Sequence, residues 1–204
     1  MTQNREIEAK TILSKTVYQN IVKAFPVKAD FKQENYYFDT TKSLLKHHKI
    51  ALRIRIFKDH AEQTLKVPDL RPVQSKFHEV IEINDKLELQ QAKSLVKQAS
   101  NDEEITFTGT VGAYLSKHFS TQKYHLLTWS KTERILLNGP ENCELTLDAT
   151  SYPDGFEDYE LEIENTDPAL IKKVLLMLEK EYNFKQTNSN TNQSKIGRAF
   201  AHQG

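Results

Sequence analysis

The sequence has 204 residues, of which 28 are basic and 28 acidic, so its formal net charge is zero. A chain without net charge has no overall field that would attract nucleic acid or an anionic membrane, so any anion-binding site must come from local clustering. Because the chain has one cysteine, no long apolar run and no signal-peptide core, we expect a soluble, cytoplasmic protein without an internal disulfide, folded as one domain over residues 1–204.

The first informative stretch lies near the start, where Glu6, Glu8 and Lys10 alternate with Ile7 and Ala9. In a strand, successive side chains point to opposite faces, so the three charged side chains would project together. Glu6 and Lys10 are also four residues apart, in the order that stabilises a solvated helix. From this stretch alone, a strand and a helix both remain open.

Two elements are predicted next. Residues 14–25 carry apolar side chains at helical spacing, and Ser14 is a suitable N-cap. Residues 34–40 are aromatic and typical of a strand. Asp39 stands beside Thr40 at the end of this strand, which favours a turn at that point.

The alternation in residues 50–56 places Arg53 and Arg55 on one face and leucine and isoleucine on the other. Two neighbouring guanidinium groups repel each other unless an anion or carboxylates lie between them, and their planar forks suit phosphate or carboxylate. The solvated outer face of a sheet is the alternative. Residues 63–68 predict another strand, which carries Lys66.

A further strand is predicted over residues 76–83, with Phe77, Ile81 and Ile83 on one side and Glu82 on the other. Two helices are then predicted, over residues 87–99 and 110–119.

The strand predicted over residues 126–137 carries two basic candidates, Lys131 and Arg134, which point to opposite faces if the strand is regular. At most one of them therefore points with the other charges. Asn138 and Gly139 follow and are a signal for a hairpin.

The next two strands continue the alternation of charges. Residues 144–150 place Asp148 opposite leucine and alanine, and residues 158–165 place Glu160 and Glu162 opposite leucine and isoleucine. After them, Asp167 and Pro168 predict the cap and first turn of a helix that runs to residue 182. Lys195 and Arg198 lie in the tail.

Charged faces therefore recur on strand after strand. If all were solvated, the opposite faces would need a continuous apolar cover, which the few predicted helices could supply only in part. A sheet closed into a barrel, with helices outside and charges inside, solves this problem. Burying an unpaired ion costs on the order of tens of kcal/mol, so such an interior must be wet and must bind ligands. Basic groups suit a polyanion and carboxylates suit a hard divalent cation, which together point to a metal-bound polyphosphate.

This pattern resembles the CYTH superfamily of triphosphate tunnel metalloenzymes, which includes class IV adenylate cyclases and thiamine triphosphatases. The motifs that carry the resemblance are Glu-x-Glu-x-Lys at residues 6–10, YYFDT at 36–40, ALRIR at 51–55, TLK at 64–66, Asp148, and Glu-x-Glu at 160–162. The resemblance implies an α+β fold: a closed, antiparallel, eight-stranded β-barrel tunnel, open at both ends, with helices packed outside.

The resemblance also implies roles for individual residues. The triphosphate would be bound by Lys10, Arg53, Arg55, Lys66, Lys195 and a basic residue of the 126–137 strand, for which Lys131 fits better by its spacing to Asp148 and Arg134 is the alternative. The principal divalent ion, Mg²⁺ or Mn²⁺, would be bound by Asp148, Glu160 and Glu162. Glu6 and Glu8 would position a second ion or the attacking water and would, with Lys10, form the catalytic set. Glu82 resembles a further tunnel carboxylate.

The function expected from the resemblance is metal-dependent hydrolysis of inorganic tripolyphosphate to pyrophosphate and phosphate, since we find no feature that would read a base. A class IV-type adenylate cyclase, a thiamine or nucleoside triphosphatase, and a non-catalytic polyphosphate-binding module remain the alternatives. The expected partner is a small-molecule triphosphate, without nucleic acid or membrane, and the protein is expected to be a monomer or a homodimer.

Overall fold

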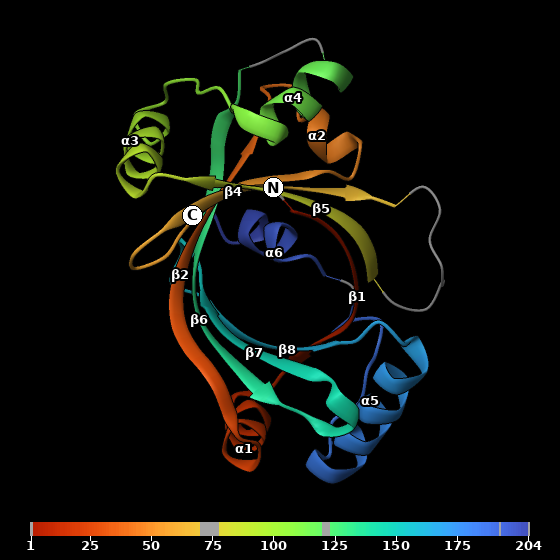
Figure 1. Cartoon of the computed structure of the whole chain (residues 1–204). Helices are drawn as coiled ribbons and strands as arrows, with labels where there is room; N and C mark the ends of the chain where they lie inside the picture. Colours follow the sequence, from red (N-terminus) through yellow and green to blue (C-terminus); the bar gives the residue numbers. More distant parts are fainter. Residues whose placement is uncertain (1, 70–77, 120–122, 192, 204) are drawn as a thin grey trace.

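The computed structural model describes residues 2–69, 78–119, 123–191 and 193–203, and for residues 2–6 and 78 it describes the backbone. In this part of the chain, eight antiparallel strands close into a barrel in the order β1-β5-β4-β3-β2-β6-β7-β8 (Figure 1). The strands are β1 (Thr2–Leu13), β2 (Val27–Asp39), β3 (Ala51–Ile56), β4 (Ala61–Pro68), β5 (His78–Leu87), β6 (His125–Asn138), β7 (Glu144–Ser151) and β8 (Glu157–Glu164). The expected closed barrel is confirmed.

Six helices accompany the barrel in the described residues. They are α1 (Lys15–Ala24), α2 (Leu44–His47), α3 (Leu89–Ala99), α4 (Gly109–His118), α5 (Pro168–Tyr182) and α6 (Lys195–Ala201), and a short 3₁₀ turn, η1 (Pro140–Asn142), joins β6 to β7. None of these helices is long and apolar enough to cross a membrane.

Most predicted elements are confirmed, and their ends follow local capping rules. Glu6, Glu8 and Lys10 lie in a strand, β1, rather than in a helix. Ser14 caps α1 by accepting a hydrogen bond from the Val17 backbone N–H at 3.3 Å. The predicted strand over residues 76–83 begins at residue 78 as described, and Lys76 and Phe77 lie outside the described residues.

Two apolar cores cover the outside of the barrel. On one side, the outward faces of β2–β5 pack against α2, α3 and α4; on the opposite side, β1, β7 and β8 pack against α1 and α5 (Figure 1). The first core includes Phe38, Leu45, Leu52, Ile54, Leu65 and Val111, and the second Ile21, Leu145, Leu161, Ile171 and Leu178, all at most 1% exposed. Burying each such side chain stabilises the folded state by about 1.5–3 kcal/mol. The inward faces are thereby left to polar residues.

One helix departs from the expected arrangement of helices outside an open tunnel. α6 lies within the ring of strands at one end of the barrel (Figure 1). Thr128 on the inner face of β6 donates a hydrogen bond to the Ala199 carbonyl at 2.9 Å, and Ala199 packs with Tyr37 and Tyr152. Ile196 and Ala199, three residues apart on one side of α6, pack against Tyr37 and Tyr152, and the basic side chains of α6 pair with carboxylates inside the barrel.

Candidate active site

The register of the barrel places opposite charges beside each other on its inner face. Three pairs stand directly across from each other in neighbouring strands: Lys10 with Glu162, Arg134 with Asp148, and Lys66 with Glu82. Side chains alternate between the two faces of a strand. Once one such pair points into the barrel, the face of each remaining residue in both strands is therefore known. The charged faces expected from the sequence therefore converge in one interior.

The acidic wall of this interior comes from β1, β7 and β8. Its carboxylates are those of Glu8, Asp148, Glu160 and Glu162, each at most 3% exposed. One carboxylate oxygen from each of Asp148, Glu160 and Glu162 lies within 4.8 Å of the others. Glu8, Glu162 and Glu164 form a second such group. Buried carboxylates at this density require positive charge close by.

Lys10 and Arg134 supply part of that charge. The Lys10 Nζ lies 2.7 Å from Glu162 Oε1 and 2.9 Å from Glu8 Oε1. Arg134 donates two hydrogen bonds to Asp148, from Nε to Oδ1 at 2.8 Å and from Nη2 to Oδ2 at 2.7 Å, and reaches Glu162 Oε2 at 3.2 Å. The two-bond geometry fixes the Asp148 carboxylate as a single lysine could not.

Lys195, the first residue of α6, supplies a third positive charge to the acidic wall. Its Nζ pairs with Asp148, lies 2.7 Å from Glu160 Oε2 and 3.7 Å from Glu162 Oε1. One ammonium group from the tail therefore contacts the same three carboxylates that stand close enough to share a cation.

The basic wall lies across the interior, on β3 and β4, and consists of Arg53, Arg55 and Lys66. Arg53 Nη2 donates to Glu82 Oε1 at 3.0 Å, and Lys66 Nζ lies 3.9 Å from the same oxygen. Arg55 donates from Nε to Asn35 Oδ1 at 2.9 Å. This wall carries more positive than negative charge, so an anion between the walls would be attracted to it.

The electrostatics of the two walls differ, as their pKa values show. Burial alone would raise the pKa of Glu162, but the charges of Lys10 and Lys195 hold this pKa well below its usual range. Burial lowers the pKa of Arg55 to about 10, and the neighbouring charges of Arg53 and Arg134 act in the same direction. Glu162 is thus held in its ionised form, whereas the charge on Arg55 would be stabilised by an additional anion.

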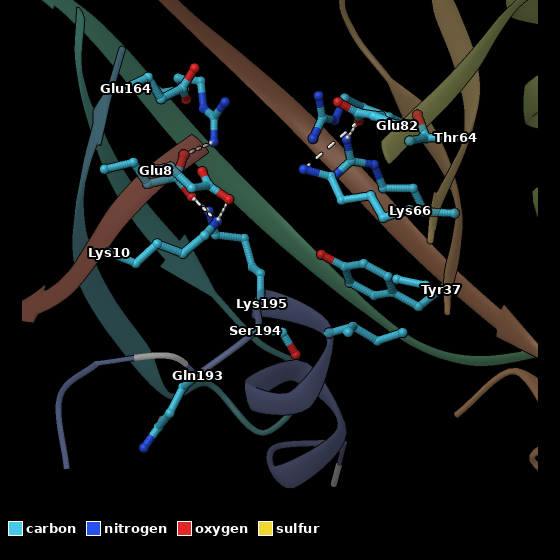
Figure 2. Close-up of a pocket in the computed structure, with 16 residues that line it drawn as sticks. Glu8, Lys10, Tyr37, Thr64, Lys66, Glu82, Glu164, Gln193, Ser194 and Lys195 are labelled. Carbon is cyan, nitrogen blue, oxygen red and sulfur yellow. Dashed lines mark hydrogen bonds and ion pairs between the residues drawn. The ribbon is translucent and has the colours of Figure 1, made fainter. Parts of the chain in front are cut away.

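Residues from both walls line one cavity of about 120 Å³. Figure 2 shows Glu8 and Lys10 on one side of it and Lys66 and Glu82 on the other, with Lys195 reaching in from the start of α6. Asp148 and Glu160 are buried in the wall against Lys195 and are not among the residues that line the cavity.

The expectation that Lys131 faces the interior is wrong, and Arg134 takes this place. Lys131 pairs with Ser151 in the register, lies outside the barrel, and has a side chain that is 55% exposed, 3.5 Å from Glu34 and 5.4 Å from the ring of Trp129. Spacing along the sequence suggested Lys131, but in the antiparallel register it is Arg134 that stands opposite Asp148.

The remaining predicted residues are also located. Glu82, which lies on β5, lines the cavity, as the family resemblance implied. Glu6 lies in β1 opposite Val80, two residues before Glu8, and the structure describes its backbone only.

Sequence reasoning assigned no role to two charged residues that the structure brings to the interior. Glu164 lines the cavity, and its position two residues after Glu162 on the same strand face was the signal that could have identified it. Arg198 is 7% exposed and contacts Glu160. It lies three residues after Lys195, hence on the same side of a helix.

The acidic wall fits a hard divalent cation on the basis of its donors. Asp148, Glu160 and Glu162 offer carboxylate oxygens, the ligand type that Mg²⁺, Ca²⁺ and Mn²⁺ prefer, within a distance of one another that one ion can bridge. The positive groups that neutralise these carboxylates are the basic side chains described above. A bound cation would interact with the same carboxylates as those side chains do.

Comparison with known proteins gives a consistent picture. A family model described as the CYTH domain matches residues 4–192. YjbK of Bacillus subtilis (strain 168), whose name describes it as a candidate triphosphatase, is 43% identical over 70 residues, which are 33% of this chain and 37% of YjbK. The chain thus matches little more than a third of the length of this curated relative.

Two solved structures cover the chain almost completely. A candidate adenylate cyclase from Bacillus halodurans is 28% identical with a TM-score of 0.80, over 98% of this chain and 100% of that one. HpAC1 from Hippeastrum, described as a candidate adenylyl cyclase with a dominant triphosphatase activity, is 23% identical with a TM-score of 0.76, over 96% of this chain and 95% of that one. At its lower identity, the second likeness supports the fold alone.

Proposed function

The chain belongs to the CYTH family, and from this premise we propose that it is a divalent-metal-dependent triphosphatase that cleaves inorganic tripolyphosphate to pyrophosphate and phosphate. The observation that carries the proposal is one cavity in which the arginine and lysine side chains of β3 and β4 face the buried carboxylates of Glu8 and Glu162. A polyanion and a divalent cation are the two ligands that such walls attract together. The candidate triphosphatase YjbK adds support from its similar segment.

The basic residues would bind and orient the triphosphate. Arg53 and Arg55 present planar forks that suit phosphate oxygens, and Lys66 adds a point charge beside them. The proposed triphosphate-binding set is Lys10, Arg53, Arg55, Lys66, Arg134 and Lys195. Phosphoryl transfer depends mainly on positioning and on charge stabilisation, so this set can contribute much of the catalysis.

The carboxylates would hold the cation and orient the nucleophile. Asp148, Glu160 and Glu162 would bind Mg²⁺ or Mn²⁺, and Glu8 with Glu6 would position a second ion or the attacking water. When bound, such a cation neutralises phosphate charge and polarises the phosphoryl oxygens. Lys10 joins the two functions because it contacts Glu8 and Glu162 while lining the cavity.

A second candidate function is cyclisation of ATP to cyclic AMP and pyrophosphate. It is favoured by the name of the Bacillus halodurans structure, a candidate adenylate cyclase at 28% identity. The two reactions differ in their products, since hydrolysis of tripolyphosphate releases orthophosphate with pyrophosphate, whereas cyclisation of ATP releases cyclic AMP with pyrophosphate. A protein that only binds polyphosphate would release neither.

The test is product release from tripolyphosphate, ATP and thiamine triphosphate, each with Mg²⁺, with Mn²⁺ and with a chelator. We expect rapid orthophosphate release from tripolyphosphate that the chelator abolishes. Cyclic AMP from ATP would replace the proposal with the cyclase, and tight binding of tripolyphosphate without turnover would replace it with a binding module.

Glu160→Gln supplies a sharper version of the same test. It keeps the shape of the side chain but removes a charge from the acidic wall, so we expect the metal requirement to rise and turnover to fall by roughly 100-fold or more. Glu157→Gln is the matched control, since it makes the same change on the same strand at an exposed position. Full activity of Glu160→Gln at ordinary metal concentrations would contradict the proposed metal site.

A further inference from the structure

Arg198 joins two parts of the proposed site that are far apart in the sequence. It lies on α6, three residues after Lys195, and is 7% exposed. Its Nε lies 2.6 Å from Asp158 Oδ2, and its Nη1 donates to Glu160 Oε1 at 3.0 Å. The guanidinium is therefore held against the inner face of β8.

The same guanidinium also holds the chain that leads into α6. Nη1 donates to the Gln193 carbonyl at 2.7 Å, directly before the N-cap Ser194, whose Oγ accepts from the Gly197 backbone N–H at 3.2 Å. Residues on both sides of Lys195 are thus fixed. As a result, the Lys195 side chain starts from a defined point inside the barrel.

The two oxygens of Glu160 are divided between these basic residues. Oε1 accepts from Arg198, while Oε2 lies 2.7 Å from Lys195 Nζ. A carboxylate held at one oxygen by a rigid planar donor has its second oxygen aimed in one direction. Here that direction is toward the group formed with Asp148 and Glu162.

Arg198 is itself supported from behind. The Tyr152 hydroxyl donates to Asp158 Oδ2 at 2.7 Å and accepts from Arg198 Nε at 3.1 Å. Burial alone would lower the pKa of Arg198, but Glu160 raises it above its usual value, so the guanidinium stays charged. Outer groups of this kind commonly set the orientation of metal-binding carboxylates.

We propose that Arg198 is a positioning residue that fixes the Glu160 carboxylate and the start of α6 together, so that Glu160 Oε2 and Lys195 Nζ are held as one unit beside Asp148 and Glu162. The inference rests on the proposed function, because it takes Glu160 as a metal-binding residue. Arg198 does not line the cavity and would not contact the substrate. It would act through Glu160 and Lys195.

The test is Mn²⁺ binding to the full chain, measured by electron paramagnetic resonance, together with steady-state hydrolysis of tripolyphosphate. Arg198→Met should weaken Mn²⁺ binding by roughly 10–100-fold, the usual cost of losing an orienting group. Arg198→Lys keeps the charge but not the fork, so it should regain thermal stability while Mn²⁺ binding stays weakened at least about tenfold. Tyr152→Phe should change Mn²⁺ binding in the same direction but less.

Lys46→Met is the matched control. Lys46 on α2 lies 4.0 Å from the centre of the Phe200 ring and so contacts α6 away from the carboxylates. It should leave Mn²⁺ affinity and turnover unchanged. If Lys46→Met weakens Mn²⁺ binding as much as Arg198→Met, the effect is general loosening of α6 and the inference is overturned.

Two further outcomes separate this inference from the proposed function. Wild-type protein that hydrolyses tripolyphosphate and binds Mn²⁺, with Tyr152→Phe and both Arg198 variants binding Mn²⁺ as tightly, would overturn the inference and leave the function standing. Wild-type protein that neither binds Mn²⁺ nor hydrolyses any triphosphate would overturn both.

Discussion

At the scale of single residues, the interior is built from charges that neutralise one another in pairs. Glu162 is 3% exposed and contacts Lys10 at 2.7 Å and Arg134 at 3.2 Å. Removing either partner would leave a buried carboxylate with less compensation, which is costly in a low-dielectric interior. We therefore expect few substitutions of these buried charges to be tolerated. For activity, the charged residues that point into the barrel matter more than the total number of charges on a strand.

Arg134 and Lys131 test this point on one strand. Arg134→Met should reduce kcat/KM for tripolyphosphate on the order of 100-fold or more, because it removes the fork that holds Asp148. Lys131→Met should change kcat/KM by less than about twofold, since its side chain lies outside the barrel. Steady-state kinetics, with circular dichroism to check folding, measures both. Equal losses in the two variants would contradict the assignment.

At the scale of elements, short polar segments position the longer ones. Asp39 ends β2 and is 2% exposed. Its carboxylate accepts three backbone hydrogen bonds, from Thr40 at 2.7 Å, Leu45 at 2.8 Å and Lys46 at 2.9 Å. The turn predicted at Asp39 and Thr40 is thus confirmed. The Asp39 carboxylate also accepts hydrogen bonds from backbone N–H groups of α2.

Asp39→Ala should therefore lower the free energy of unfolding by roughly 2–4 kcal/mol, because three donors lose a charged acceptor in a buried place. Asp59→Ala is the control. Asp59 pairs with His60 at 2.6 Å, but its side chain is 83% exposed, so its loss should leave the free energy of unfolding nearly unchanged. Urea denaturation measures both. Similar losses would mean that the Asp39 cap contributes little.

At the scale of the whole molecule, the barrel separates two kinds of stabilisation. Its outer faces bury apolar side chains under α1–α5, while its inner face pairs charges and encloses α6. The first kind depends little on pH. The second changes when buried groups gain or lose protons, so it gives stability a defined pH dependence.

We expect the unfolding free energy, measured with a chelator present, to fall below about pH 5. Burial alone would raise the pKa values of Asp148, Glu160 and Glu162, but neighbouring cations, Lys195 among them, hold all three below their usual values. Groups with lowered pKa values in the folded state stabilise it above their unfolded-state pKa, near 4, and this contribution is lost as pH falls through their folded-state values. Denaturant titrations from pH 7 to pH 3 measure it. A constant unfolding free energy over this range would contradict the pairing.

The alkaline side should mirror this behaviour. Burial alone would lower the pKa values of Lys10 and Lys195, but the acidic wall raises both above their usual values. Their contribution is present in full below the unfolded-state value, near 10.4, and is lost as pH rises through their folded-state values. Stability is therefore expected to be greatest between about pH 5 and pH 10.

The sequence by itself determined the features that depend on neighbouring residues. Alternation placed Arg53 with Arg55 and Glu160 with Glu162 on shared faces, and local caps set the starts of α1 and α5. These patterns, with the motifs they form, were enough to indicate a charged barrel. Strand periodicity acts over two residues and helix capping over three or four, so neither needs the rest of the fold.

Only the tertiary structure decided which charges meet. The register of β6 against β7 brought Arg134, rather than Lys131, opposite Asp148. The tail entered the barrel because Lys195 and Arg198 pair with carboxylates 47 and 38 residues away, and nothing local to α6 encodes that destination. Such ion pairs gain their strength from burial, which exists only once the barrel has closed around them.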